Sequence, residues 1–219
     1  MLSLNIDTFL QVMSYGDMQT EETKMERLRT LFKAKAVLHP RDLRIHGIPV
    51  RYLERLCKAG TIYRAGRGIY VASTVPDTMH LGMAQAAIAA PTGVVCLLSA
   101  LRFHEIGTQM PHQVWIALGR GTAQPRSAPK SICFVSFSGT AYSEGITTHE
   151  IAGVPIKMYS PAKTVADCFK FRNKIGLDVA IEALKAALQS RICSIDELWH
   201  FASICRVTNV IRPYLESLV

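Results

Sequence analysis

The sequence lacks the cysteine and histidine spacings that mark common metal and redox sites. Its six cysteines include no CxxC pair, and its seven histidines include no HExxH motif. An even cysteine count is compatible with disulfides, but a long, core-rich chain without a secretion signal favours buried, reduced thiols. We therefore expect no metal site and no cofactor.

Long apolar runs are also missing. No window approaches the ~18 uninterrupted apolar residues of a transmembrane helix. The first residues, MLSLNIDTFLQVMSYGDMQ, have no basic region, and Asp7 interrupts their short apolar run, so we expect no signal peptide. With 219 residues, 49% of them apolar and 19% charged, the composition is that of a folded cytoplasmic protein with one large or two small domains.

Acidic residues are scarce in one segment. The chain carries a net charge of +8, yet residues 23–72 hold twelve Lys or Arg against Glu26, Asp42 and Glu54, a local charge of +9. The rest of the chain is close to neutral. This asymmetry indicates a polyanion-binding module joined to a neutral one.

The basic segment has the element order of a winged helix-turn-helix. Apolar spacing predicts helices near residues 23–35, 40–47 and 49–59, with Gly47 and Gly60 ending the second and third. Two short strands within 61–73 follow. We expect an N-terminal extension at 1–20, a winged helix-turn-helix DNA-binding domain at 21–73 and a second domain at 74–219.

The second domain is expected to be α+β. After the linker STVPD at 73–77, the pattern predicts two buried helices, then strands, then three or four C-terminal helices. Ala152-Gly153 supplies a hairpin turn, and Ser160 with Pro161 opens a helix. Strands followed by helices favour a mixed domain with a small sheet and C-terminal helices.

The third predicted helix separates its residues by character. Val50, Leu53, Leu56 and Cys57 are expected on the buried face, and Arg51, Tyr52, Arg55 and Lys58 on the exposed face. Such an exposed face suits the major groove of DNA, where arginine binds guanine in bidentate fashion. A basic face that is merely solvated is the alternative. Arg41 and Arg44, on the preceding helix, are expected to clamp the DNA backbone.

The stretch RAGRGIYV at 64–71 has two glycines and two arginines at a turn. Its spacing fits neither GxGxxG nor GxxxxGK[ST], and it precedes a strand, so a phosphate-binding loop is excluded. Gly66 and Gly68 would allow positive φ in a hairpin turn. Arg64 and Arg67 at its tip are then expected to reach phosphates or the minor groove, the alternative being a hairpin with solvated arginines.

Two polar clusters of the second domain raise the question of catalysis. His104 with Glu105 could form a base and its orienting group, and Lys163 with Asp167 could bind a nucleotide phosphate and a metal. The structural alternative makes His104 a hydrogen-bonded interior residue and the Lys163–Asp167 pair an i,i+4 contact. No nucleophile elbow, metal set or Walker sequence supports catalysis, so we expect no enzyme.

Several successive blocks of the chain resemble one known family. GIPVRYLERLCKAGTIYRAGRGIYV is similar to the winged helix-turn-helix of AbiE-type antitoxins, the AbiEi family of type IV toxin–antitoxin systems. The resemblance continues through LLSALRFHEIGTQMPHQVWIAL, HEIAGVPIKMYSPAKTVADCFKFRNKIGLDVAIEALKAAL and RPYLESL. It covers about residues 24–219 and leaves residues 1–20 outside.

The resemblance implies a function in abortive-infection systems of this type. Such a protein represses its own operon by binding inverted repeats in double-stranded DNA, and its C-terminal domain counteracts a nucleotidyltransferase-like toxin. The DNA-binding role passes to Arg51, Tyr52 and Arg55 in the third helix and to Arg64 and Arg67 in the wing. Two protomers per operator would match inverted repeats, as a homodimer or as separate molecules.

Two other functions remain open at this point. One is a protein-binding antitoxin that sequesters its toxin directly, and the other is a nucleotide-dependent transferase housed in the C-terminal domain. Trp199, Phe201 and the segment IRPYLESL fit either a partner surface or an ordinary core.

Overall fold

The computed structural model describes residues 23–75, 79–126 and 128–218. The chain divides into two compact units, one within residues 1–76 and one within residues 77–219. The N-terminal extension expected at residues 1–20 lies outside the described residues. Each unit is described by itself.

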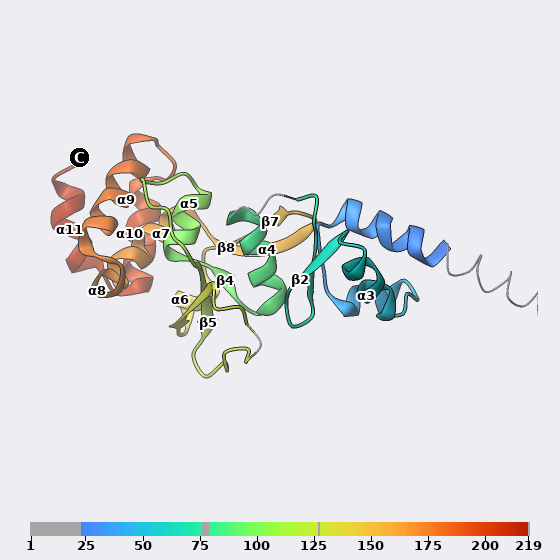
Figure 1. The fold of residues 1–219 in the computed structure, drawn as a ribbon. Helices are drawn as coiled ribbons and strands as arrows, with labels where there is room; N and C mark the ends of the chain where they lie inside the picture. Colours follow the sequence, from blue (N-terminus) through green and yellow to red (C-terminus); the bar gives the residue numbers. More distant parts are fainter. Residues whose placement is uncertain (1–22, 76–78, 127, 219) are drawn as a thin grey trace, which may run out of the picture. The chain divides into compact units, whose positions relative to one another are not determined.

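The first unit is a small helical domain with a three-stranded sheet. A helix at residues 23–34 precedes β1 (Val37–Leu38), α2 (Pro40–Ile45) and α3 (Arg51–Lys58), and the hairpin of β2 (Ile62–Gly66) and β3 (Ile69–Ala72) follows (Figure 1). The sheet order is β1-β3-β2, and both pairings are antiparallel. This is the predicted winged helix-turn-helix, with β1 as a strand that the sequence pattern did not reveal.

Apolar side chains from every element of this unit meet in one core. Leu28 and Phe32 come from the first helix, Leu43 from α2, and Leu53 and Leu56 from α3, and all five are buried. Gly47 and Gly60 have φ of +64° and +69°, which ends α2 and α3 as predicted. The core therefore fixes how α2, α3 and the hairpin are oriented toward one another.

The second unit contains a five-stranded mixed sheet of order β6-β5-β4-β8-β7. Its strands are β4 (Val94–Val95), β5 (Val114–Gly119), β6 (Ile132–Phe137), β7 (Ile146–Ile151) and β8 (Val154–Tyr159). β4–β8 and β5–β6 pair in parallel, and the other two pairs are antiparallel. The predicted turn at Ala152-Gly153 joins β7 to β8, with φ of +52° and +75°.

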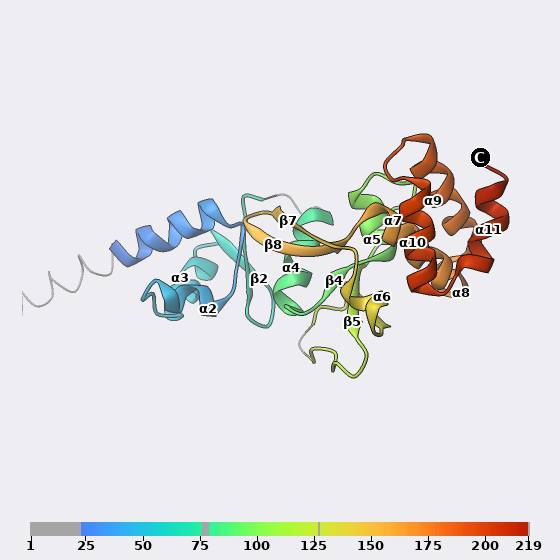
Figure 2. The same ribbon diagram turned by 180° about the vertical axis from the view of Figure 1, so that it is seen from behind.

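Helices complete this unit. α4 (Met79–Ala89) packs on the sheet, and α5 (Leu97–Phe103) contacts β5 and α7 (Pro161–Lys170). The short α6 (Thr140–Ser143) follows β6. α8 (Arg172–Ile175), α9 (Leu177–Gln189), α10 (Ile195–Cys205) and α11 (Thr208–Glu216) gather with α7 at one end of the unit, as Figures 1 and 2 show from opposite sides. The predicted α+β class is confirmed.

One predicted cap differs in detail. Ser160 occupies the N-cap of α7 and Pro161 its first position, as expected, but the Ser160 hydroxyl is buried and makes no hydrogen bond. The capping box of this unit lies instead on α10. There the Ser194 Oγ accepts from the Glu197 backbone N–H at 3.2 Å, and a Glu197 carboxylate oxygen accepts from the Ser194 N–H at 2.8 Å.

Candidate nucleic-acid interface

The third helix, α3, buries an apolar stripe and exposes basic residues. Leu53 and Leu56 are buried, whereas Arg51, Arg55 and Lys58 are exposed. The helix spans residues 51–58, two residues shorter at its start than predicted, and Val50 stands before its first turn with no capping side chain. The three exposed cations agree with the predicted basic face.

Tyr52 is a correction to the predicted face. Its side chain is fully buried in the core of the unit, and its hydroxyl has no hydrogen-bond partner. Tyr52 lies one turn before the buried Leu56, so the i,i+4 rule already groups these two residues. The prediction grouped Tyr52 with Arg55, three residues later, rather than with Leu56, four residues later. Tyr52 therefore does not contact a base directly.

Tyr52 has a different relation to the two arginines. The guanidinium carbons of Arg51 and Arg55 lie 5.7 Å and 5.5 Å from the centroid of the Tyr52 ring. Both distances are within the range of cation–π attraction. The buried ring thus lies beside the two arginines that the sequence analysis assigned to base contacts.

Val50 is the second departure from the predicted face. It was expected among the buried apolar residues, but 39% of it is exposed. Val50 directly precedes Arg51, where α3 begins, and it has helical backbone angles, φ −58° and ψ −28°. An exposed apolar side chain at the N-terminal end of a recognition helix can contact a thymine methyl group.

The wing differs from its prediction in where the arginines and glycines sit. Arg67 and Gly68 form the two-residue turn, whereas Arg64 lies within β2, paired with Tyr70. Only Gly68 has positive φ, at +74°, and Gly66 lies at a β-bulge between Arg64 and the turn. Arg67 is therefore at the tip, and Arg64 is not.

Arg64 lies within β2 rather than at the tip. Its Nε donates to the Gly66 carbonyl oxygen at 3.2 Å. Burial raises the pKa of the Cys57 thiol, and the positive charge of Arg64 partly counteracts this. Arg64 thus adds an exposed positive charge to the first strand of the wing.

Arg41 and Arg44 on α2 are exposed, as are all the predicted DNA-binding residues except Tyr52. α2 begins with a reciprocal cap. His39 Nδ1 accepts from the Arg41 backbone N–H at 3.1 Å, and Asp42 Oδ2 accepts from the His39 backbone N–H at 2.7 Å. This cap uses the carboxylate of Asp42, one of the three acidic residues in the basic segment.

Sequence reasoning missed His39. Its ring lies against Gly68 of the wing turn, because a Cβ atom added to Gly68 would be 2.9 Å from His39 Nε2. Burial lowers the pKa of His39, Arg41 lowers it further, and Asp42 opposes them. The signal in the sequence was the spacing His39-Pro40-Arg41-Asp42, a cap followed by proline and an acid at the third helical position.

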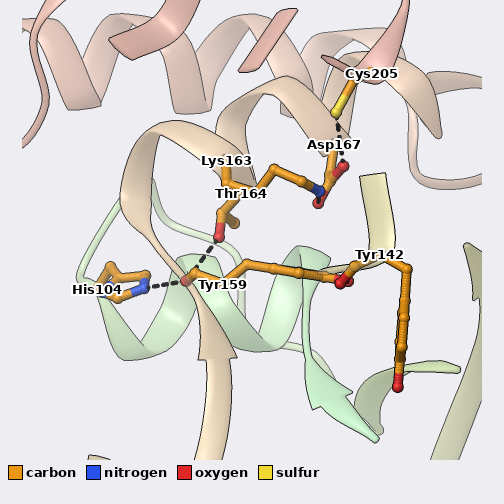
Figure 3. A network of polar contacts seen from close by, with 7 residues as sticks. All are labelled: His104, Tyr142, Tyr159, Lys163, Thr164, Asp167 and Cys205. Carbon is orange, nitrogen blue, oxygen red and sulfur yellow. Dashed lines mark hydrogen bonds and ion pairs between the residues drawn. The ribbon is translucent and has the colours of Figure 1, made fainter. Parts of the chain in front are cut away.

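In the second unit, Lys163, Asp167 and His104 belong to one network of polar contacts between packed elements (Figure 3). Lys163 Nζ donates to Asp167 Oδ2 at 2.5 Å, and both side chains are fully buried. The Lys163 ammonium also lies 4.0 Å from the centroid of the Tyr159 ring. On the other side of the pair, Cys205 Sγ donates to Asp167 Oδ1 at 3.1 Å. The pair is the predicted i,i+4 contact, and it is closed to solvent phosphates.

His104 completes this arrangement from α5. Its Nε2 donates to the Tyr159 carbonyl oxygen at 2.8 Å, which assigns the proton to that nitrogen, and the Thr164 hydroxyl donates to the same oxygen at 3.2 Å. Burial raises the pKa of Asp167, against the opposing effect of Lys163. Glu105 is exposed. These contacts join α5, β8, α7 and α10 rather than line a substrate cleft.

The described part of the chain contains no group of three His, Cys, Asp or Glu side chains arranged to hold a metal ion. Trp199 and Phe201 pack against the core of the second unit and are partly buried. No helix among the described residues has the length and hydrophobicity needed to span a bilayer.

The sequence of the first unit matches a known protein family over most of its length. Residues 26–73 match the family described as "Transcriptional regulator, AbiEi antitoxin". By this match the first unit is similar to the regulator domain of AbiEi antitoxins. The match covers most of the first helix together with α2, α3 and the wing, and it confirms the resemblance for this part of the chain. The family is a regulatory one.

A solved structure is similar over more of the chain. The crystal structure of the RV2827C protein from Mycobacterium tuberculosis has a TM-score of 0.58 and 13% sequence identity, and the similarity covers 83% of this chain and 71% of that one. At this identity, the similarity concerns the fold alone. No curated protein sequence matches the chain significantly.

Proposed function

We propose that the protein is the antitoxin of a toxin–antitoxin operon and represses its own promoter by binding inverted repeats in double-stranded DNA. The observation that carries the proposal is the exposed basic face of α3, with Arg51 and Arg55 beside the Tyr52 ring, in a domain of the AbiEi regulator family. A DNA-binding protein of this kind acts in the cytoplasm.

Each exposed cation among the predicted DNA-binding residues has a proposed role. Arg51 and Arg55 contact bases in the major groove, because the N-terminal part of a recognition helix lies nearest the base edges. Lys58 at the end of α3 and Arg64 in β2 neutralise phosphates, and Arg41 and Arg44 clamp the backbone from α2. Arg67, at the wing tip, contacts phosphate or the minor groove. Inverted repeats would place one protomer on each half-site.

The second unit is proposed to counteract a nucleotidyltransferase-like toxin. The sequestration and transferase alternatives differ in what they require of this unit. A transferase based on Lys163 and Asp167 would need both groups open to solvent, and both are fully buried. Co-purification of the full chain with the product of the adjacent gene tests sequestration. Retention of the toxin on the chain would support direct contact, and neutralisation without retention would exclude it.

A gel-shift titration tests DNA recognition. The probe is the DNA upstream of the protein's own gene, and the competitor is random duplex of the same length. We expect Arg51→Ala/Arg55→Ala to lose the preference for the upstream DNA. A matched control, Lys130→Ala/Lys185→Ala, removes the same charge from exposed positions of the second unit and should keep the preference. Equal affinity of the wild type for both DNAs would refute the proposed function.

A further inference from the structure

The two edges of the His39 ring make contacts with different elements, α2 and the wing. At one edge, Nδ1 accepts the Arg41 backbone N–H at 3.1 Å and caps α2. Pro40 has no N–H, and the Asp42 N–H donates to the His39 carbonyl oxygen at 2.9 Å, so the cap satisfies the remaining donor of the first turn. Asparagine or serine could make the same hydrogen bond, since both are common N-cap residues. Capping alone does not require a ring.

The other edge of the ring meets the wing. A Cβ atom on Gly68 would lie 2.9 Å from Nε2 and 3.3 Å from Cδ2, so the turn backbone packs directly on the imidazole. Gly68 has φ of +74°, and it directly follows Arg67 in the two-residue turn. The β1–β3 pairing, with Leu38 opposite Tyr70, aligns His39 with the wing turn.

The cap bond also fixes the ring itself. Because Nδ1 accepts a backbone N–H, the neutral ring carries its proton on Nε2 and is held in one orientation at the start of α2. A side chain that is anchored in this way and packed against backbone has little freedom to move. The wing turn is therefore positioned against a fixed surface and not only by its own strands.

We propose that His39 is a positioning residue for the wing, and that its ring holds the turn so that Arg67 contributes to DNA affinity. The inference rests on the proposed DNA-binding function. His39 acts through Arg67 and makes no contact with DNA in this scheme. Replacement of His39 should then lower the DNA affinity only while Arg67 is present.

A double-mutant cycle on the full chain tests this coupling. His39→Asn and Arg67→Ala are compared singly and together, with the upstream DNA as ligand, at pH 8, where His39 and asparagine are both neutral. We expect His39→Asn to weaken binding about threefold to tenfold in the wild-type background, the range of ordinary pairwise coupling. The double variant should bind as weakly as Arg67→Ala alone. His39→Ser, a second capping side chain without a ring, should repeat the pattern.

Several outcomes would overturn the inference. They are wild-type affinity in both His39 variants, an equal loss in the Arg67→Ala background, or loss of the folded first unit in both variants, which would make the ring a stability element. The same titration separates this failure from that of the proposed function. In the latter case the wild type itself would not prefer the upstream DNA over random duplex.

Discussion

Arg55 lies beside the buried ring of Tyr52, with 5.5 Å between the guanidinium carbon and the ring centroid. Arg51 approaches the same ring at 5.7 Å. One aromatic side chain of the core thus neighbours both arginines that we assign to base contacts. A single core side chain therefore contributes to the stability of the first unit and lies against the exposed arginines of α3.

Removal of the Tyr52 hydroxyl should lower neither the stability of the first unit nor its DNA affinity. The hydroxyl is buried without a partner, so Tyr52→Phe removes an unpaired polar group and should raise the free energy of unfolding by about 1 kcal/mol. DNA affinity should stay unchanged, because the ring beside the arginines remains. Thermal melting by circular dichroism measures the change.

Tyr52→Leu is the matched comparison, since it keeps an apolar core residue but removes the ring. It should lower the affinity for the upstream DNA more than Tyr52→Phe does. Equal affinity of the two variants would contradict a role of the ring in ordering Arg51 and Arg55.

The Lys163–Asp167 pair should tolerate joint replacement better than single replacement. Lys163→Met leaves the Asp167 carboxylate buried without its cation, which costs about 3–5 kcal/mol of stability. Lys163→Met/Asp167→Leu removes both charges and should unfold at a higher temperature than Lys163→Met. Tryptophan fluorescence follows this transition, because both tryptophans, Trp115 and Trp199, lie in the second unit. Additive losses in the double variant would show that the two charges do not stabilise each other.

The second unit should lose stability in mild acid through His104. Burial lowers the pKa of His104, and His149 lowers it further, against the opposing effect of the bond to the Tyr159 carbonyl. The unfolded chain therefore binds a proton more readily than the folded unit, so the stabilisation is complete above about pH 6.5 and declines as pH falls below it.

The measurement is the melting temperature by tryptophan fluorescence at pH 8 and pH 5. His104→Gln should have a smaller difference between the two pH values than the wild type. His112→Gln, which changes an exposed histidine of the same unit, is the control and should behave as the wild type. If the melting temperature of His104→Gln differed between pH 8 and pH 5 as much as that of the wild type, His104 would not be the cause of the lost stability in acid.

Salt dependence should separate phosphate contacts from base contacts on α3. Each neutralised phosphate contributes about −0.9 to the slope of log K against log salt. Lys58→Ala should make the slope shallower by about that amount and leave the preference for upstream over random DNA intact. Arg55→Ala should reduce that preference by about 1–3 kcal/mol. If neither variant changes slope or preference, the basic face of α3 is merely solvated.

Most elements of the fold could be predicted because their signals are local. The spacing of Leu53 and Leu56, the glycines at 47 and 60, and the Ala152-Gly153 turn each act within a few residues of chain. The two-residue strands β1 and β4 could not be found in this way. They exist only because β3, β5 and β8 offer partners distant in the sequence.

The candidate site also has some features that the sequence indicates and others that only the structure shows. Which residues are cations follows from the sequence, and their concentration in residues 23–72 indicated the polyanion partner. The burial of Tyr52, the exposure of Val50 and the position of Arg64 within a strand are set by how α3 and the hairpin pack in the folded unit.

By itself, the sequence determined the order of helices and strands, the excess of positive charge in the first unit and the resemblance to the AbiEi family. Only the tertiary structure showed which side chains lie against the exposed arginines of α3 and against the wing turn. Helix spacing brings Tyr52 close to Arg51 and Arg55, but the full burial of its ring does not follow from spacing, and no spacing rule pairs the His39 ring with Gly68. The physical reason is that burial and close packing arise from the whole core, whereas helix and turn propensities arise from neighbouring residues.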